Sequence, residues 1–477
     1  MKNLLHYLTI ILLIPVFCSI TVFGQSSANI EGNWLGTLEV SGIELRLVLK
    51  VSKSGPDALA AKLDNIDQGI NDLPIDEISQ KDNSVQFDTK KLGLNFEGTL
   101  NAKGDEISGI FKQGANSFPL IFKRIAEIPR IARPQDPQKP YPYGEEEVSY
   151  ENKQDGVKLA GTLTLPRNEE KHPAVILITG SGSQDRNETV VGHHPFLVLA
   201  DYLSRRGIAV LRVDDRGVGG SSLGSPNATS ENYAGDVLSG IEYLKSRQEI
   251  NQKQIGLIGH SEGGMIAPLV AVRSKDVAFI VLLAGPGQTG EEIIYAQNEL
   301  IVKSNVTNPI LAAQIMIAVK NMLAILKSDA ENRLVEQRIS EAFAKQSSEM
   351  SEDQKKAFAS VQASMKTQLP AMMSAWYRYF LAYNPRQTLE KVTIPVLALN
   401  GENDTQVSAK ENLPLIANAL KIGGNKDYSI KSFPKLNHLF QTSQTGLADE
   451  YGKIEETIAP TVLETISDWI FKETSNK

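Results

Sequence analysis

The sequence predicts a chain of two folded parts: a small antiparallel β-domain, followed by an α/β domain whose mostly parallel sheet carries helices on both faces. Three observations lead to this fold class. Short alternating strands separated by turn residues fill 30–124. Apolar strands alternate with helical periods from about residue 144. A helical stretch at 288–390 interrupts that alternation, which then resumes, so we expect an inserted cap rather than a separate helical domain.

The first 24 residues differ from the rest, because Lys2 is their only charged residue and an apolar run follows it. We expect a secretory signal peptide at 1–24, cut near Gly24–Gln25, and therefore an exported protein, periplasmic or extracellular. The alternatives are an uncleaved membrane anchor and a lipoprotein anchor at Cys18, although Phe17 stands where a lipoprotein needs a small residue. Cleavage removes the only cysteine, which excludes disulfides and cysteine metal sites from the mature chain.

Composition narrows the classes of partner. The chain has 477 residues, of which 41 % are hydrophobic and 22 % charged, as in ordinary globular proteins. A formal net charge of −7 without basic runs argues against nucleic acid. No other run looks apolar enough to cross a bilayer. The glycines at 213–222 fit neither G-x-G-x-x-G nor a P-loop, and no metal-ligand spacing occurs, so we expect no cofactor and no metal. The oligomeric state stays open.

Three boundaries follow from these patterns. The strands at 25–124 suit a small barrel or sandwich. Five prolines at 125–143 make that segment a linker with extended backbone. The α/β domain then occupies 144–477. Its expected buried strands are "AVILITG" (174–180), "IAVLRVDDRG" (208–217), "QIGLIG" (254–259), "VAFIVLLAG" (277–285) and "PVLALNG" (395–401).

The stretch "GHSEGG" (259–264) joins one of these strands to a helix. Gly-x-Ser-x-Gly occurs by chance in many chains, but here strand, tight turn and helix follow one another, which is the setting of a nucleophile elbow. Ser261 is therefore the candidate nucleophile. The glycines suit a turn that crowds strand and helix backbones together.

A serine hydroxyl needs a base, and the histidines of the chain differ in their positions relative to the expected strands. His260 should point away from its neighbour, and His172 precedes the first buried strand at the opposite edge of the sheet. His193 and His194 lie in a loop near the catalytic edge and are candidate substrate-side residues. His438 follows the last strand, where the base is expected when the order is nucleophile, acid, base.

The acid should follow the strand after the cap, where Glu402 and Asp404 both occur. Asp404 lies further beyond the strand end and is the candidate, holding the imidazole of His438 in its tautomer. The backbone N–H groups of Glu262 and Ser181 are the candidate oxyanion donors. In the cap, Met372, Trp376, Tyr379 and Tyr383 recur at helical spacing. Core packing is the default interpretation of this run, with Trp376 as a candidate substrate-side residue.

The motifs together resemble a known family. "ILITGSGSQDRNE", "VLRVDDRGVGGS", "IGLIGHSEGGMIAP", "IPVLALNGENDTQV" and "LNHLFQ" are similar to those of bacterial secreted α/β hydrolases of the serine-aminopeptidase-like group, which includes carboxylesterases. The resemblance covers about 150–477 and implies an α/β-hydrolase fold. It also implies Ser261, Asp404 and His438 as the triad and Ser181 with Glu262 as oxyanion donors. Thr179-Gly180 stands where lipases have His-Gly.

The leading hypothesis is a secreted serine hydrolase that cleaves small carboxylic esters through an acyl-enzyme on Ser261. A serine peptidase of the aminopeptidase type and an acyl or thioester hydrolase are the alternative enzymes. An inactive ligand-binding protein with the same fold is the alternative outside enzymes.

Overall fold

The computed structural model describes residues 29–40, 43–56, 58–90, 93–114, 116–129, 131–168, 170–328 and 331–475. The expected signal peptide at 1–24, with Cys18, lies outside the described residues and stays a prediction. The described chain divides into two compact units. One unit runs up to Asn65 and continues over Asn71–Ile128; the other joins Ile66–Ile70 to the residues from Pro129 onward.

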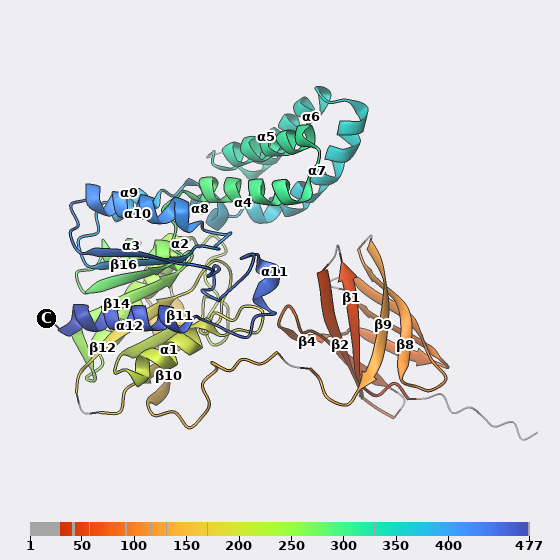
Figure 1. The fold of residues 1–477 in the computed structure, drawn as a ribbon, viewed down its shortest axis with the longest axis horizontal. Helices are drawn as coiled ribbons and strands as arrows, with labels where there is room; N and C mark the ends of the chain where they lie inside the picture. The colour runs from red at the N-terminus through yellow and green to blue at the C-terminus, as the bar shows by residue number, and fades with distance from the viewer. Residues whose placement is uncertain are drawn as a thin grey trace, which may run out of the picture. The chain divides into compact units, whose positions relative to one another are not determined.

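The first unit is a nine-stranded sheet in the order β4-β3-β2-β1-β9-β8-β7-β6-β5 (Figure 1). Its strands are β1 Gly32–Val40, β2 Ile43–Lys53, β3 Leu59–Asn65, β4 Ile70–Pro74, β5 Glu77–Lys81, β6 Ser84–Thr89, β7 Leu94–Leu100, β8 Glu106–Gln113 and β9 Asn116–Ile125. The sheet curls, since β3 also contacts β5. Aromatic side chains fill its interior, where Phe96 packs 5.1 Å from Phe87 and 5.3 Å from Phe122 between ring centroids.

The second unit contains an eight-stranded sheet in the order β10-β11-β13-β12-β14-β15-β16-β17. Its strands are β10 Gly144–Asn152, β11 Val157–Leu165, β12 His172–Ile178, β13 Ala209–Val213, β14 Ile250–His260, β15 Phe279–Leu283, β16 Val396–Gly401 and β17 Tyr428–Phe433. The pairs from β13 to β17 are parallel, whereas β10 and β11 are antiparallel. The parallel pairs bring the carboxyl ends of the central strands to one edge.

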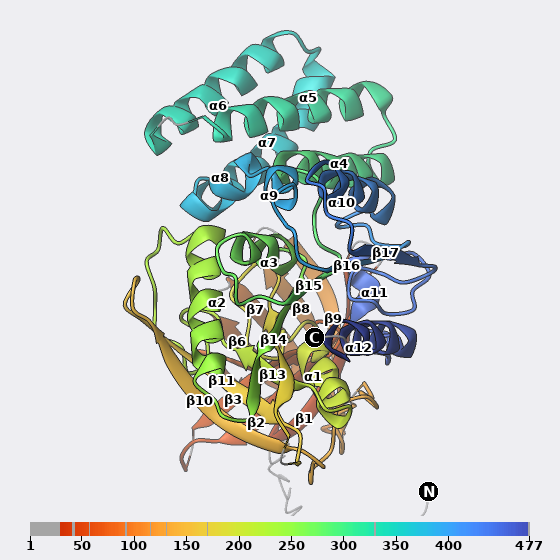
Figure 2. The ribbon, with the colours of Figure 1, turned by 90° about the vertical axis from the view of Figure 1, so that its left-hand side faces the viewer.

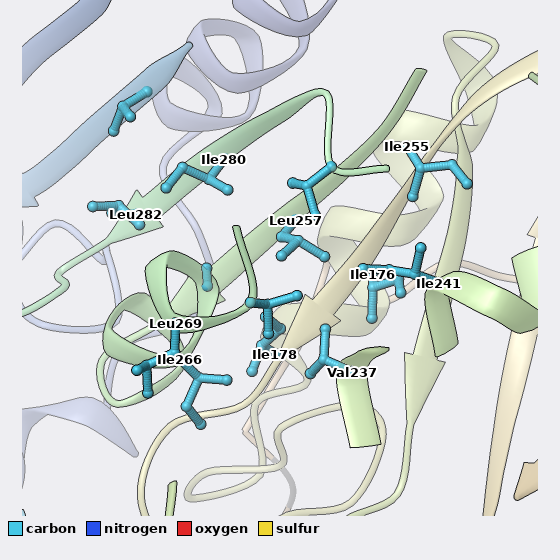
Figure 3. Close-up of a cluster of buried hydrophobic side chains, with 14 of the residues drawn as sticks. Ile176, Ile178, Val237, Ile241, Ile255, Leu257, Ile266, Leu269, Ile280 and Leu282 are labelled. Atoms are coloured by element: carbon cyan, nitrogen blue, oxygen red, sulfur yellow. The ribbon is translucent and has the colours of Figure 1, made fainter. Parts of the chain in front are cut away.

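Helices cover both faces of this sheet, because alternate side chains of a strand point to opposite faces. On one face Ile176 and Leu257 pack against α2 Ser230–Lys245, α3 Gly263–Ala271 and α10 Ala409–Ile422 (Figure 3). On the other, Val175 and Ile258 pack against α1 Pro195–Arg205 and α12 Pro460–Ser475. The short helix α11 Ala448–Tyr451 precedes α12.

The cap lies between β15 and β16 in sequence, as predicted by the interrupted alternation. It contains α4 Gly290–Asn305, α5 Pro309–Leu326, α6 Asn332–Ser348, α7 Glu352–Met372, α8 Ala375–Ala382 and α9 Pro385–Leu389. Figures 1 and 2 show α5 and α6 as the cap helices farthest from the sheet. Around Val319, Leu323 and Phe358 the cap has a hydrophobic core of its own.

Two expectations for the cap are wrong. The run with helical spacing from Met372 to Tyr383 is not one helix: α7 ends at Met372, and Ser374, which accepts a hydrogen bond from the N–H of Tyr377, is the N-cap that starts α8. A second apolar run of bilayer length does exist, since α5 has a mean hydropathy of 1.8 over 18 residues, with 33 % of them buried. Its buried residues, such as Val319 and Leu323, pack within the cap.

Leu257, fully buried in the middle of β14, tests this core. Leu257→Ala should lower the free energy of unfolding by about 3 kcal/mol, because the lost methyl groups leave a cavity in packed surroundings. The exposed Leu223 is the control, and Leu223→Ala should change stability by less than about 0.5 kcal/mol. Chemical denaturation measures both, and equal losses would contradict the assignment of this core.

Candidate active site

The turn around Ser261 is shaped by close approach of backbones. β14 ends at His260, α3 begins at Gly263, and Ser261 between them has φ 53°, in the left-handed region. A Cβ placed on Gly259 would lie 2.0 Å from the carbonyl oxygen of Gly263. The N–H of Ser261 donates to the carbonyl of Leu283 on β15, at 2.8 Å. This strand-to-helix turn is the geometry predicted for a nucleophile elbow.

Asp404 and His438 meet as the sequence predicted. The imidazole Nδ1 of His438 lies 2.8 Å from Oδ2 of Asp404, and both side chains are buried. The other oxygen of Asp404 accepts the N–H groups of Gln406 and Val407, each at 2.8 Å. The carboxylate therefore has a fixed orientation. With Nδ1 donating to it, Nε2 of His438 keeps its lone pair and can accept a proton.

The segment of His438 lies against that of Ser261. His260, directly before Ser261, is bonded through Nε2 to the carbonyl oxygen of His438 at 3.0 Å. The two imidazole rings have centroids 4.9 Å apart. Residues 178 positions apart in the chain are thus brought together at the carboxyl edge of the sheet.

The loop after β12 also reaches the elbow. A Cβ on Gly180 would lie 3.2 Å from Cβ of Ser261, so the loop passes directly beside this serine. Within the described part of the chain, the backbone N–H groups of Ser181 and Glu262 donate no hydrogen bond. Both residues adjoin Ser261 in space or sequence, which suits the predicted role of donors to an oxyanion.

The side chain of Glu262, to which the sequence assigned no role, is a central part of the site. It is 3 % exposed, and its Oε1 accepts the hydroxyl of Ser230 at 2.6 Å and the indole N–H of Trp376 at 2.8 Å. Burial raises the pKa of Glu262, against the opposing effect of hydrogen bonds from Ser230, Trp376 and Ser181. Trp376 stacks on Phe380 of α8, so this carboxyl group links the elbow to the cap.

The two candidate substrate-side histidines have structural roles instead. His193 is fully buried, with Nδ1 2.9 Å from the hydroxyl of Thr457 and Nε2 2.9 Å from the carbonyl of Tyr451. Burial is the main reason that the pKa of His193 falls to about 4. His194 pairs through Nδ1 with Asp136 at 2.9 Å. The expectation is wrong for both, because the loop folds against the linker and the C-terminal segment rather than into the site.

Two further carboxyl groups lie near the site, Glu188 buried and Asp215 half-buried. Glu188 is 2 % exposed and accepts the N–H of Gly180 at 2.7 Å. Asp215 accepts the hydroxyl of Thr179 and the N–H of Gln184, each at 2.9 Å, and burial raises its pKa to about 7. Asp215 and Glu262 line one small cavity of about 60 Å³. Within the described residues, no group of three or more His, Cys, Asp or Glu side chains could hold a metal ion.

Trp376→Phe tests the contact between cap and elbow, since it keeps a ring on Phe380 but removes the N–H donor. Unfolding free energy should fall by about 1–3 kcal/mol while Glu262 is ionised, because a buried carboxylate loses a donor. The lost donor raises the pKa of Glu262 further, so the deficit should shrink as pH falls through that pKa. Denaturation over a pH series measures this. The same change in a Glu262→Gln background is the control, and a deficit in the single variant that is constant with pH would contradict the contact.

The chain is also similar to known proteins. The profile of the X-Pro dipeptidyl-peptidase (S15) family matches residues 155–421, more than half of the chain. Esterase EstD of Thermotoga maritima is 25 % identical over 386 residues, covering 78 % of this chain and 76 % of the relative.

Solved structures with similar folds include two esterases. The Pyrococcus furiosus esterase Pf2001 is 15 % identical, with a TM-score of 0.42 over 72 % of this chain and 97 % of that chain. Est1E of Butyrivibrio proteoclasticus with bound ferulic acid is 17 % identical, with a TM-score of 0.41 over 69 % of this chain and 99 % of that chain. On the match to the family profile, this chain belongs to the X-Pro dipeptidyl-peptidase (S15) family of serine hydrolases.

Proposed function

We propose that this protein hydrolyses carboxylic esters of small substrates through an acyl-enzyme on Ser261. The observation that carries the proposal is the buried Asp404–His438 pair, in which Nδ1 and Oδ2 are 2.8 Å apart. The segment of this histidine lies against that of Ser261, which has a left-handed backbone conformation at a strand-to-helix turn. Similarity to an esterase over most of both chains supports esters as the substrate class.

In the first half of the reaction, Oγ of Ser261 attacks the carbonyl carbon of the ester while its proton passes to Nε2 of His438. Asp404 stabilises the imidazolium through Nδ1–H. The negative charge that develops on the carbonyl oxygen is received by the N–H groups of Ser181 and Glu262. The tetrahedral intermediate then collapses, and the leaving alkoxide takes the proton from His438 as the alcohol departs.

In the second half, water gives a proton to His438 and attacks the acyl-enzyme. Collapse of this second intermediate returns the proton to Oγ of Ser261 and releases the carboxylic acid. The N-terminal end of α3 faces the same charge and stabilises it further. We keep Trp376 as a substrate-side residue, because its half-buried ring reaches from the cap to the residue that follows the nucleophile.

Ser261→Ala tests the nucleophile. The variant should lose at least about a thousandfold in kcat on p-nitrophenyl acetate and butyrate, and all labelling by a fluorophosphonate probe, since no oxygen remains to be acylated. Ser225→Ala, at an exposed serine, is the control and should retain both. A folded wild-type protein that neither labels nor hydrolyses these esters would contradict the proposal.

Asp404→Asn tests the choice of acid. An amide in place of the carboxylate favours the wrong imidazole tautomer, so kcat should fall by about 10³–10⁴ while KM changes little. Glu402→Gln is the matched control, because the exposed Glu402 accepts, among the described residues, only the hydroxyl of Ser432. Steady-state kinetics measures both variants. If Glu402→Gln were the more damaging change, the assignment of the acid would have to be reversed.

Peptide hydrolysis is the second candidate, because the family whose profile matches is named for an X-Pro dipeptidyl-peptidase. The same triad would cleave an amide, with the leaving amine taking its proton from His438. Purified protein should be compared on p-nitrophenyl butyrate, aminoacyl p-nitroanilides and X-Pro p-nitroanilides. We expect the ester to have the higher kcat/KM, and the reverse order would favour the peptidase.

A further inference from the structure

A second buried histidine pair lies beside the proposed triad. His260 and Glu188 are 7 % and 2 % exposed, and Nδ1 of the histidine lies 2.9 Å from Oε1 of the glutamate. The other ring nitrogen, Nε2, lies 3.0 Å from the carbonyl oxygen of His438. Neither side chain takes part in the acyl transfer described above. Their geometry nevertheless limits the protonation state of His260.

Both ring nitrogens of His260 face an oxygen atom. A neutral imidazole has one N–H, so its other nitrogen would direct a lone pair at either the carboxylate of Glu188 or the carbonyl of His438. Only the imidazolium, with two N–H groups, satisfies both oxygens. Burial lowers the pKa of His260, but the charge and hydrogen bond of Glu188, the carbonyl of His438 and the charge of Asp404 outweigh it, so the pKa is raised.

The pair joins three segments of the site. Oε1 of Glu188 accepts the N–H of Gly180 at 2.7 Å, and Gly180 directly precedes the oxyanion donor Ser181. His260 is the last residue of β14 and directly precedes Ser261. Its Nε2 bonds to the carbonyl oxygen of His438. A single imidazolium therefore connects the oxyanion loop, the nucleophile and the base.

The surroundings make these contacts strong. Among the described residues, the charges of Glu188 and Asp404 act on His260, and the ring of His438 lies 4.9 Å from that of His260 between centroids. Apolar side chains from α1, β15 and the C-terminal segment form the remaining wall: Phe196, Leu199, Leu283, Phe440 and Ile458. Hydrogen bonds between charged groups gain strength where water is excluded. Loss of the proton would therefore leave a buried carboxylate without its counter-charge, which is costly.

We propose that the Glu188–His260 ion pair is a positioning device that holds His438 and the oxyanion loop in register with Ser261, and that it does so only while His260 is protonated. The proposal rests on the proposed ester hydrolysis. Because the folded-state pKa of His260 is raised, the contribution of the pair is present below that pKa and lost as pH rises through it. His438 must be neutral to act as base, whereas His260 must keep its proton to hold the base in place, so loss of the proton from His260 lowers activity on the alkaline side.

The central experiment is the pH profile of kcat for Glu188→Gln. Glutamine keeps an oxygen for the N–H of Gly180 but removes the negative charge, so the pKa of His260 falls. We expect the alkaline limb to move to lower pH by at least about one unit. At alkaline pH, kcat should then be about tenfold lower, with KM within about twofold, and activity should recover at lower pH.

Two further variants separate positioning from a general structural role. His260→Gln should lower kcat at every pH and abolish the alkaline limb of the profile. In the double variant, adding Glu188→Gln should lower kcat little further than His260→Gln alone. His172→Gln is the matched control, at another buried histidine placed at the start of β12. It should lower thermal stability without changing the shape of the profile. If Glu188→Gln behaved like this control, the proposal would be overturned.

The protonation state can be read without any assay. In ¹⁵N-histidine-labelled wild type, both nitrogens of His260 should still carry a proton at pH values above the ordinary pKa of histidine. Assignment uses the spectrum of His260→Gln. A single protonated nitrogen at neutral pH would sink the proposal even in an active ester hydrolase. If both nitrogens were protonated in a protein that neither reacts with the fluorophosphonate probe nor cleaves esters, the proposed function would be contradicted, but the protonated Glu188–His260 pair would be confirmed.

Discussion

The site depends on how closely β14 and α3 approach each other at residues 259–263. A Cβ on Gly263 would lie 2.1 Å from the carbonyl oxygen of Ile178, so glycine is required at the point where the helix passes the neighbouring strand. The turn forces Ser261 into left-handed backbone, a strain of about 1–3 kcal/mol that the surrounding packing must sustain. Ile266 and Leu269 of α3, packed on the sheet, provide that support. The half-buried position of Ser261 just before α3 is therefore a consequence of the hydrophobic core.

Around this turn the protein places carboxyl groups where water is scarce. Asp404, Glu188 and Glu262 each accept at least two hydrogen bonds, and each therefore has a set orientation. Their partners differ in kind. Asp404 and Glu188 face histidines, whereas Glu262 receives neutral donors and has a raised pKa. The indole N–H of Trp376, on α8 of the cap, donates to Glu262, so the orientation of this side chain next to Ser261 depends on the cap.

Much of the architecture could be predicted because the relevant signals are local. Alternating apolar strands and helices indicate a sheet with two covered faces, and a strand, a glycine-rich turn and a helix around Ser261 indicate the elbow. Asp404 and His438 were found by their order along the chain. His193 was misplaced, because its partner Thr457 lies 264 residues away and no local pattern marks that contact. The helical spacing from Met372 to Tyr383 did not indicate the break before α8, because a single N-cap at Ser374 interrupts an otherwise continuous pattern.

The sequence by itself determined the elements, the elbow and the order of the candidate triad, since each depends on residues close together or on the direction of parallel strands. Only the tertiary structure decided which polar side chains share a buried space. Glu262 contacts Trp376, 114 residues away, and His260 contacts Glu188, 72 residues away. Such pairs arise because burial requires every charge to find a partner, and which partner is within reach depends on packing between distant segments.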